Sequence, residues 1–108
     1  MVKRGDIISA VLPGDYGKPR PVLVVQSDLF DQHPSVTVLP ITSHMVDAPL
    51  FRLSLDPERT GLNRPSQVMI DKATTIARKR LVQPIGRMPE DDMLRLNRLL
   101  AVFMGIVT

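Results

Sequence analysis

Proline and glycine punctuate almost the whole chain, and their spacing leaves room only for short secondary-structure elements. Ten prolines and six glycines are scattered rather than clustered among the 108 residues. The runs between them are rich in β-branched and apolar residues, which is typical of strands separated by turns. These runs predict about six strands, at residues 6–12, 20–26, 36–41, 50–55, 66–71 and 81–85.

Several local details refine this prediction. The run 20–26 is apolar at successive positions, which favours a central strand buried on both faces. Pro40 indicates that the third strand ends there or lies at an edge, because proline cannot donate to a strand ladder. Residues 56–65 form a hydrophilic loop in this interpretation, and residues 73–76 continue the fifth strand or pair with it. Gly86 is expected to stop the sixth strand.

In the last part of the chain the apolar residues recur at steps of three and four, which is the spacing of a helix and not of a strand. Pro89 suits the first position of a helix, and the acidic residues 90–92 suit its positive end. Gly105 is expected to end the helix. The apolar face of this helix is formed by Met93, Leu96, Leu100 and Phe103. The fold class is therefore α+β and mainly β, with a strongly bent antiparallel sheet and one C-terminal helix in a single domain, residues 1–108.

Composition narrows the class of function. The chain has no cysteine, which excludes disulfides and thiolate metal sites and fits the cytoplasm. No signal peptide or membrane span is evident, and no metal or cofactor motif is present. The net charge is +3, which is compatible with nucleic-acid binding, while the aromatic fraction of 4% is too low for a base-stacking sheet. A bound RNA would be held mainly by charge and shape.

Two strand ends carry polar groups suited to chemistry. Arg20 lies between Pro19 and Pro21, which stiffen the backbone and preorganise a guanidinium to receive an oxyanion. Thr42 follows an apolar strand and can present its hydroxyl to a cleft. Each also has a simpler interpretation, since Arg20 could be a solubilising rim residue and Thr42 a turn cap. His33 and the second histidine, at position 44, are interpreted as solvated loop residues rather than ligands or bases.

Four stretches in order along the chain together resemble the MazF/PemK family of toxin endoribonucleases. They are residues 3–7, residues 20–26, residues 39–43 and the region around Asp71. The resemblance implies an SH3-like barrel, a homodimer, and metal-free cleavage of single-stranded RNA at short recognition sequences. It also implies a cognate antitoxin, expected to be an acidic segment that folds onto the basic groove near Lys18, Arg20 and the loop 43–49.

The resemblance also assigns roles to residues. The family's catalytic arginine and threonine fall on Arg20 and Thr42, and its acidic residue on the fifth strand falls on Asp71. For proton transfer, the candidates are Asp15, Asp71 and Lys18. The residues expected to bind RNA are Lys18, Arg20, Ser43, His44 and Lys72. No metal or cofactor is expected, because attack by the 2′-hydroxyl requires alignment, charge stabilisation and two proton transfers only.

Two rival functions remain open at this stage. The CcdB family, which poisons DNA gyrase, shares the fold, and residues 25–28 and 103–106 resemble it. CcdB proteins carry a tryptophan where this chain has Met104, and no hydroxyl residue at the position of Thr42. The other rival is a barrel that binds nucleic acid or peptide without chemistry. The basic run 78–80 is interpreted as a solvated cluster at a strand end rather than an RNA site.

Overall fold

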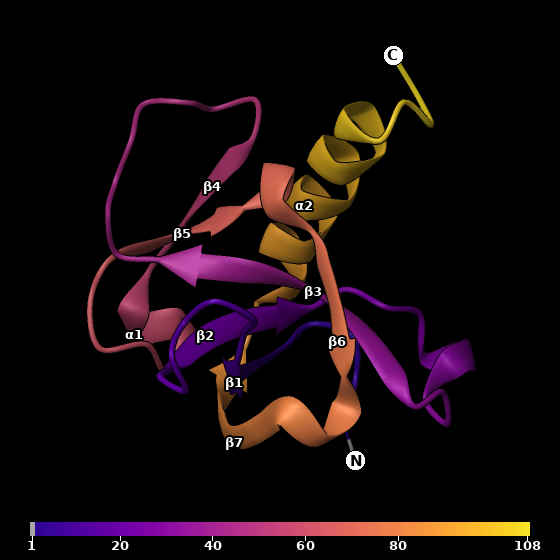
Figure 1. The fold of residues 1–108 in the computed structure, drawn as a ribbon. Helices are drawn as coiled ribbons and strands as arrows, with labels where there is room; N and C mark the ends of the chain where they lie inside the picture. The colour runs from indigo at the N-terminus through magenta and orange to yellow at the C-terminus, as the bar shows by residue number, and fades with distance from the viewer. Residues whose placement is uncertain (1) are drawn as a thin grey trace.

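The computed structural model describes residues 2–108, and these residues form a bent β-sheet with a helix packed on one side (Figure 1). The strands are β1 (Asp6–Val11), β2 (Pro19–Val24), β3 (Ser35–Thr42), β4 (Arg52–Leu55), β5 (Ser66–Met69), β6 (Thr74–Ala77) and β7 (Leu81–Arg87). The helices and 3₁₀ turns are η1 (Asp28–Phe30), α1 (Pro57–Thr60), η2 (Ile70–Lys72), η3 (Arg78–Arg80) and α2 (Glu90–Phe103). No helix within residues 2–108 has the length and apolarity to cross a membrane.

All strand pairs are antiparallel, in the order β4-β5-β3-β2-β1-β7, with β6 paired to β3. This confirms the mainly β, α+β fold with a C-terminal helix. The sequence predicted about six strands, whereas the described residues form seven, because residues 74–77 make a separate strand. No described strand joins β4 to β7, so the expected barrel is not closed by strand pairing.

Pro40 lies inside β3 and not at its end, which corrects the expectation from sequence. It pairs with Val22 on β2, in the middle of the sheet. On its other side, β3 pairs with β6 up to Val38 and with β5 from Ile41 onward. Pro40 therefore falls in the gap where the strand changes partner. A residue with no N–H is accommodated at such an interruption of the ladder.

Gly86 also has a different role from the one predicted, because β7 continues through it to Arg87. A Cβ at this position would come within 1.9 Å of the Thr60 carbonyl oxygen. A Cβ at Gly61 would likewise lie 2.6 Å from the carbonyl oxygen of Ile85. The two glycines thus let the end of α1 lie directly against β7. Because α1 follows β4 directly, this contact links the two ends of the strand order, β4 and β7, which do not pair with each other.

The segment 56–65, expected to be a loop, contains the short helix α1. Asp56 caps it by accepting a hydrogen bond from the main-chain N–H of Glu58 at 2.9 Å, and Pro57 occupies the first turn. Gly61 ends the helix with a left-handed φ of 83°. These are ordinary start and stop signals. The helix has only four residues, too few to show a helical period in the sequence.

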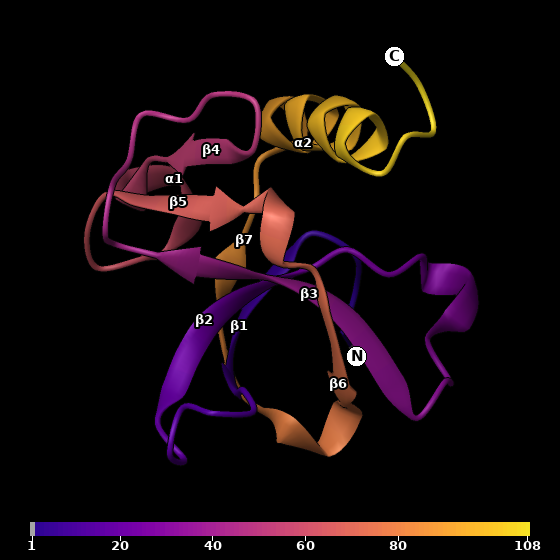
Figure 2. The same cartoon turned by 45° about the horizontal axis from the view of Figure 1, so that its top comes forward.

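Two hydrophobic cores lie on opposite faces of the central strands. Ile7 and Ile8 are adjacent on β1 and point to different cores, since successive side chains of a strand alternate. The prediction that β2 is central is confirmed, because Val22, Leu23 and Val24 are all buried. Figure 2 shows α2 and β6 on opposite sides of β3; α2 contributes Leu96 to the first core, and β6 contributes Ile76 to the second.

Helix α2 begins at Glu90 and closes the first core. Leu96 is fully buried there, which alone contributes roughly 2 kcal/mol of hydrophobic stabilisation. Met93 and Leu100 pack against the same core, as predicted. Phe103 departs from the prediction, because it is 48% exposed at the end of the helix.

Both ends of α2 lie close to where the sequence placed them. Pro89 occupies the cap position, one residue before the place predicted for it. Gly105 follows the helix with a φ of 76°, and the N–H of Ile106 donates to the carbonyl of Ala101 at 2.8 Å. This arrangement satisfies a carbonyl at the helix end.

Candidate functional site

A groove of about 960 Å³ runs across the face of the sheet between the β1–β2 loop and the segment that follows α1. Three of the side chains that line it are basic and one is acidic, so its charge favours an anionic ligand. These four are Asp15, Arg20, Arg64 and Lys72. The volume lies within the range of small-molecule sites.

Arg20 on β2 and Thr42 on β3 both line this groove, and strand register brings them there. Val22 lies opposite Pro40, so two residues further along the antiparallel pair position 20 comes opposite position 42. Residues two apart on a strand share a face, which places the Arg20 side chain on the face of the buried Val22. The arginine and the threonine therefore meet where the second core ends.

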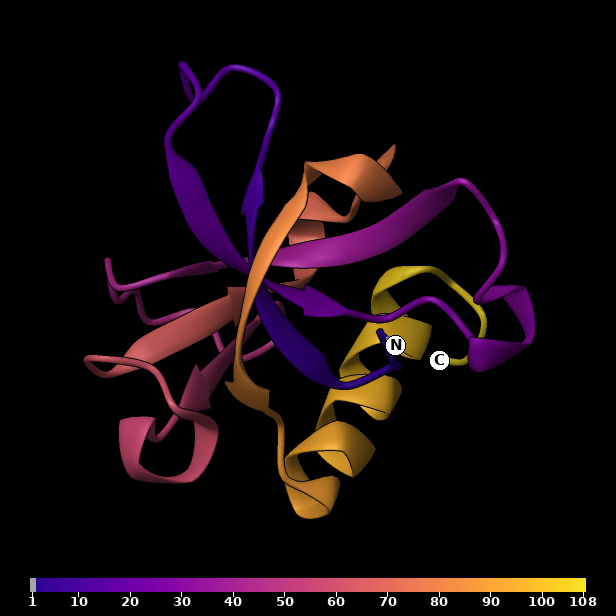
Figure 3. The same ribbon diagram turned by 90° about the horizontal axis from the view of Figure 1, so that it is seen from below.

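Asp15 lies beside Arg20, with Oδ2 of the carboxylate 3.7 Å from Nε of the guanidinium. The Arg20 side chain is 49% exposed, so its remaining donors are open to the groove. The loop that carries Asp15 turns sharply through left-handed residues at Gly14, Tyr16 and Gly17. Tyr16 is unusual in having a φ of 54° without being glycine, which costs about 1 kcal/mol. Figure 3 shows this loop projecting from the end of the β1–β2 hairpin.

The hydroxyl of Thr42 is oriented by its own backbone. Its Oγ1 accepts a hydrogen bond from the main-chain N–H of His44 at 3.1 Å, the cap contact that the simpler interpretation expected. Because that contact uses only an acceptor position, the hydroxyl proton is free to donate to a ligand. The loop that follows is held by buried Gln67, whose amide both donates to and accepts from the backbone of Val46. Ser43 lines the groove beside Thr42.

Asp71 does not line the groove. It lies in η2 and forms an ion pair and hydrogen bond with Arg52 from β4. The Arg52 side chain is largely buried, its guanidinium lies 5.3 Å from the Phe51 ring centre, and within residues 2–108 its Nε has no hydrogen-bond partner. The next residue, Lys72, does line the groove. The pair therefore holds the turn that presents Lys72.

The other candidate residues also fall into two groups, those that line the groove and those that do not. Among the residues singled out from sequence, the groove brings together Asp15, Arg20, Thr42, Ser43 and Lys72. Lys18 and His44 are exposed but are not part of its lining. The main-chain N–H of Lys18 donates to the carbonyl of Asp15 at 3.0 Å, so this residue helps to close the turn that carries the carboxylate.

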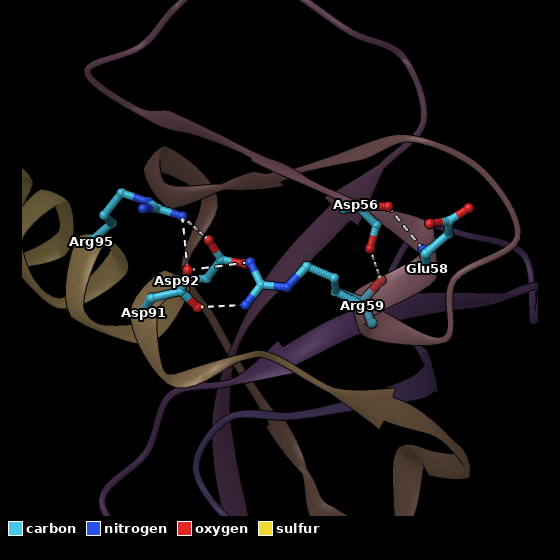
Figure 4. A network of polar contacts seen from close by, with 7 residues as sticks. Asp56, Glu58, Arg59, Asp91, Asp92 and Arg95 are labelled. Carbon is cyan, nitrogen blue, oxygen red and sulfur yellow. Dashed lines mark hydrogen bonds and ion pairs between the residues drawn. The ribbon is translucent and has the colours of Figure 1, made fainter.

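The wall opposite this loop is supported by an ionic network between α1 and α2 (Figure 4). Arg59 donates to both carboxylate oxygens of Asp91, at 2.8 and 3.2 Å, and lies 3.9 Å from the carboxylate of Asp92. Arg95 hydrogen-bonds to the buried Asp92. The side-chain hydrogen bond from Arg59 lowers the pKa of the Asp91 carboxyl, and the same bond raises the pKa of the guanidinium.

The sequence matches a known protein family over nearly its full length. The matching family is described as the PemK-like, MazF-like toxin of type II toxin-antitoxin systems, and the match covers residues 3–104. The chain belongs to this family. The family membership deduced from the four sequence stretches is therefore confirmed.

Relatives and solved structures agree with this assignment of a MazF-like toxin. The chain is 50% identical over 107 residues to the probable endoribonuclease MazF of Mycolicibacterium smegmatis, covering 97% of this chain and 98% of that protein. The structure resembles that of the Mycobacterium tuberculosis toxin MazF-mt6 with a TM-score of 0.81 and 29% identity, over 93% of this chain and 96% of that one. It also shares its fold with an endoribonuclease solved with its cognate antitoxin from a mycobacterial species, with a TM-score of 0.86, 20% identity, and 100% and 99% coverage.

Several groove residues of this MazF-like toxin were missed from the sequence. Asn63 and Arg64 follow α1, and Ser9 and Gln83 lie opposite each other on β1 and β7. The short hydrophilic segment 61–64 offered no signal beyond its polarity. Tertiary contacts, such as that of Gly61 with β7, bring it to the groove.

Proposed function

We propose that this MazF-like toxin is a metal-independent endoribonuclease that cleaves single-stranded messenger RNA at short recognition sequences and thereby stops translation and growth. Membership of the toxin family and 50% identity to a probable endoribonuclease support the activity. The observation that carries the proposal is the meeting of Arg20 and Thr42 in one basic groove. A binding module that performs no chemistry would not need a free hydroxyl beside the guanidinium.

In the proposed reaction the 2′-hydroxyl oxygen attacks the adjacent phosphorus while the bond from phosphorus to the 5′-oxygen breaks. The products are a 2′,3′-cyclic phosphate and a free 5′-hydroxyl, which takes its proton from solvent water. Arg20 donates to the phosphate oxygens as negative charge develops on them. Thr42 donates its hydroxyl proton to a phosphate oxygen, since its contact with the backbone N–H of His44 uses an acceptor position and leaves that proton free.

The proton of the 2′-hydroxyl needs an acceptor, and Asp15 is the candidate that the geometry supports best. It lines the groove and lies 3.7 Å from Arg20, whereas Asp71 is occupied by Arg52 and Lys18 lies outside the groove lining. A carboxylate at this distance can remove the proton while the guanidinium holds the phosphate. Asp15 is therefore our candidate for the general base.

The proposed partners follow from the surface and from the family. We propose a homodimer in the cytoplasm, because the end of α2 exposes apolar side chains that a second copy would cover. These are Val102, Phe103, Met104, Ile106 and Val107. We also propose a cognate antitoxin with an acidic segment that occupies the basic groove. A structure of similar fold was solved with its antitoxin, which supports this partner class.

The proposed function is tested by incubating the purified chain with a long single-stranded RNA in EDTA. Arg20→Ala and Thr42→Ala are compared with the native chain and with Arg98→Ala, a control on the exposed surface of α2. We expect discrete fragments from the native chain and the control, and a loss of roughly a hundredfold in rate for each groove variant. Intact RNA with folded native protein would refute the proposal and lead to a gyrase cleavage assay.

A further inference from the structure

One wall of the groove is a short segment that is fixed at both of its ends. Gly61 lies against the backbone of β7 at Ile85, and Leu62 packs against the first hydrophobic core. At the other end Ser66 is buried, and its hydroxyl donates to the carbonyl of Arg64 at 3.0 Å. Asn63 lies between these anchors and is exposed. Its backbone is therefore held in place while its side chain remains available.

The helix that precedes this segment is anchored as well. Arg59 in α1 is held by two hydrogen bonds to Asp91 at the start of α2, and Figure 4 shows the guanidinium reaching across to that helix. The hydroxyl of Thr60 donates to the carbonyl of Asp56 at 2.9 Å, inside α1. The wall is thus connected both to β7 and to α2. A recognition group needs this rigidity, because a side chain on a fixed backbone loses little entropy on binding.

Asn63 has no internal use for its polar atoms. Within residues 2–108 its side-chain amide makes no hydrogen bond, although it lines the groove that holds Arg20 and Thr42. An amide offers one acceptor and two donors side by side, which matches the edge of an unpaired base. Single-stranded RNA is recognised through such edges, since its bases are not occupied by a complementary strand.

The neighbouring Arg64 differs in chemistry. A guanidinium offers donors and a charge but no acceptor, so in a groove with a surplus of positive charge it suits the phosphate backbone. The segment therefore places a base-reading group next to a phosphate-binding group. This arrangement lies on the same groove as the proposed cleavage residues but on a different wall.

We infer that Asn63 is a specificity-determining residue that hydrogen-bonds to the edge of one RNA base beside the cleaved bond, with Arg64 contacting the adjacent phosphate. The inference rests on the proposed ribonuclease function. Asn63 itself takes no part in the bond-breaking step. Its removal changes which sequences are cut, whereas removal of Arg64 slows cutting at all sequences alike.

The test maps cleavage sites by sequencing the fragment ends of a long RNA of mixed sequence, using native protein, Asn63→Ala, Asn63→Asp and Arg64→Ala. The chain supplies a matched control, because Asn97 and Arg98 are the same pair of residues exposed on α2 and outside the groove lining. Asn97→Ala and Arg98→Ala are therefore measured in parallel. Circular dichroism and thermal melts establish that every variant is folded.

We expect both Asn63 variants to change the nucleotide preference at one position by about tenfold, while the other positions of the site stay unchanged. Arg64→Ala should lower all rates about equally, and its dependence on salt concentration should be weaker than that of the native chain. The Asn97 and Arg98 variants should match the native pattern.

Two results would overturn the inference. The first is an unchanged preference in folded Asn63 variants while native protein cuts RNA, which refutes the role of Asn63 and leaves the proposed function standing. The second is an RNA left intact by folded native protein, which refutes the proposed function and this inference with it.

Discussion

The two walls of the groove are held in different ways. The wall formed by the β1–β2 loop rests on two main-chain hydrogen bonds, from Asp15 to Leu12 and from Lys18 to Asp15, and on one loose ion pair, in which Asp15 lies 3.7 Å from Arg20. The opposite wall, residues 61–64, is fixed by contact with β7 and by the bidentate bond between Arg59 and Asp91. Arg20 and Thr42 lie on strands β2 and β3, and the proposed proton acceptor Asp15 lies on the more adaptable wall. The group proposed to read the base lies on the fixed one.

The difference in rigidity between the walls fits the two proposed tasks, which are cleavage at the phosphate and recognition of a base. A loop that can adjust allows the Asp15 carboxylate to follow the reacting group into the transition state. A fixed wall is better suited to discrimination, which depends on rejecting a base whose edge does not match. The variants below test whether the walls are separate in this way.

The largest effect is expected on the adaptable wall. Asp15→Asn removes the proposed proton acceptor but keeps the size of the side chain, and we expect the cleavage rate to fall by about a hundredfold. The stability of the protein should change little, because the Asp15–Arg20 pair is long and partly exposed. Cleavage rates measured across a range of pH test this. Retention of the native rate and pH profile would exclude Asp15 as the base.

The next effect tests the rigidity of the other wall. Gly86→Ala would place a Cβ against the Thr60 carbonyl, and we expect the free energy of unfolding to fall by about 1–3 kcal/mol as α1 is displaced. Gly14→Ala, in the β1–β2 loop, is the contrast, since its Cβ would meet no atom within 4 Å. It carries only the left-handed backbone cost of about 1 kcal/mol. Urea denaturation compares the two, and equal losses would contradict the difference between the walls.

A third variant concerns the turn between the walls. Asp71→Asn leaves the largely buried Arg52 without its charged partner, so the free energy of unfolding should fall by about 1–2 kcal/mol. If the residue only supports the turn, the cleavage rate of the folded variant should stay within about threefold of native. A rate loss of roughly a hundredfold in a folded variant would instead favour the catalytic role that the family resemblance implied for Asp71.

The smallest effect is expected for the ion pair between Arg59 and Asp91, which supports the fixed wall. Because Arg59 lowers the pKa of Asp91 in the folded state, this pair stabilises the protein above the unfolded pKa of about 3.9. The stabilisation is lost as the pH falls through the lower, folded value. The difference in unfolding free energy between native protein and Asp91→Asn should therefore be greatest near neutral pH and shrink in acid. A difference that does not vary with pH would show that the ion pair adds nothing.

Much of the fold was predictable because it depends on local pattern. The apolar runs of β1 and β2, bounded by turn residues, and the helical period around Leu96 placed these elements to within a few residues. The errors arose where distant segments decide the outcome. Pro40 is accommodated because β3 changes partner there, and β6 pairs with β3 rather than β5. Neither fact is encoded in the residues next to them.

The functional site was also predictable only in part. Arg20 and Thr42 were found through the family resemblance, since the residues alone favoured their interpretation as a rim arginine and a turn cap. The fixed wall could not be predicted from the sequence, because Arg59 and Asp91 lie 32 residues apart and Gly86 gave only the signal of a strand end. Asn63 becomes a candidate only once those contacts are known.

The most direct test of the account uses a short RNA that contains one mapped cleavage site, together with the same RNA carrying a single 2′-deoxy sugar at that site. Both are incubated with native protein in EDTA, and the fragment ends are identified by mass spectrometry. We expect cleavage of the first RNA to a 2′,3′-cyclic phosphate and a 5′-hydroxyl, and no cleavage of the second. Equal cleavage of both would show that the 2′-hydroxyl is not the nucleophile and would contradict the central claim.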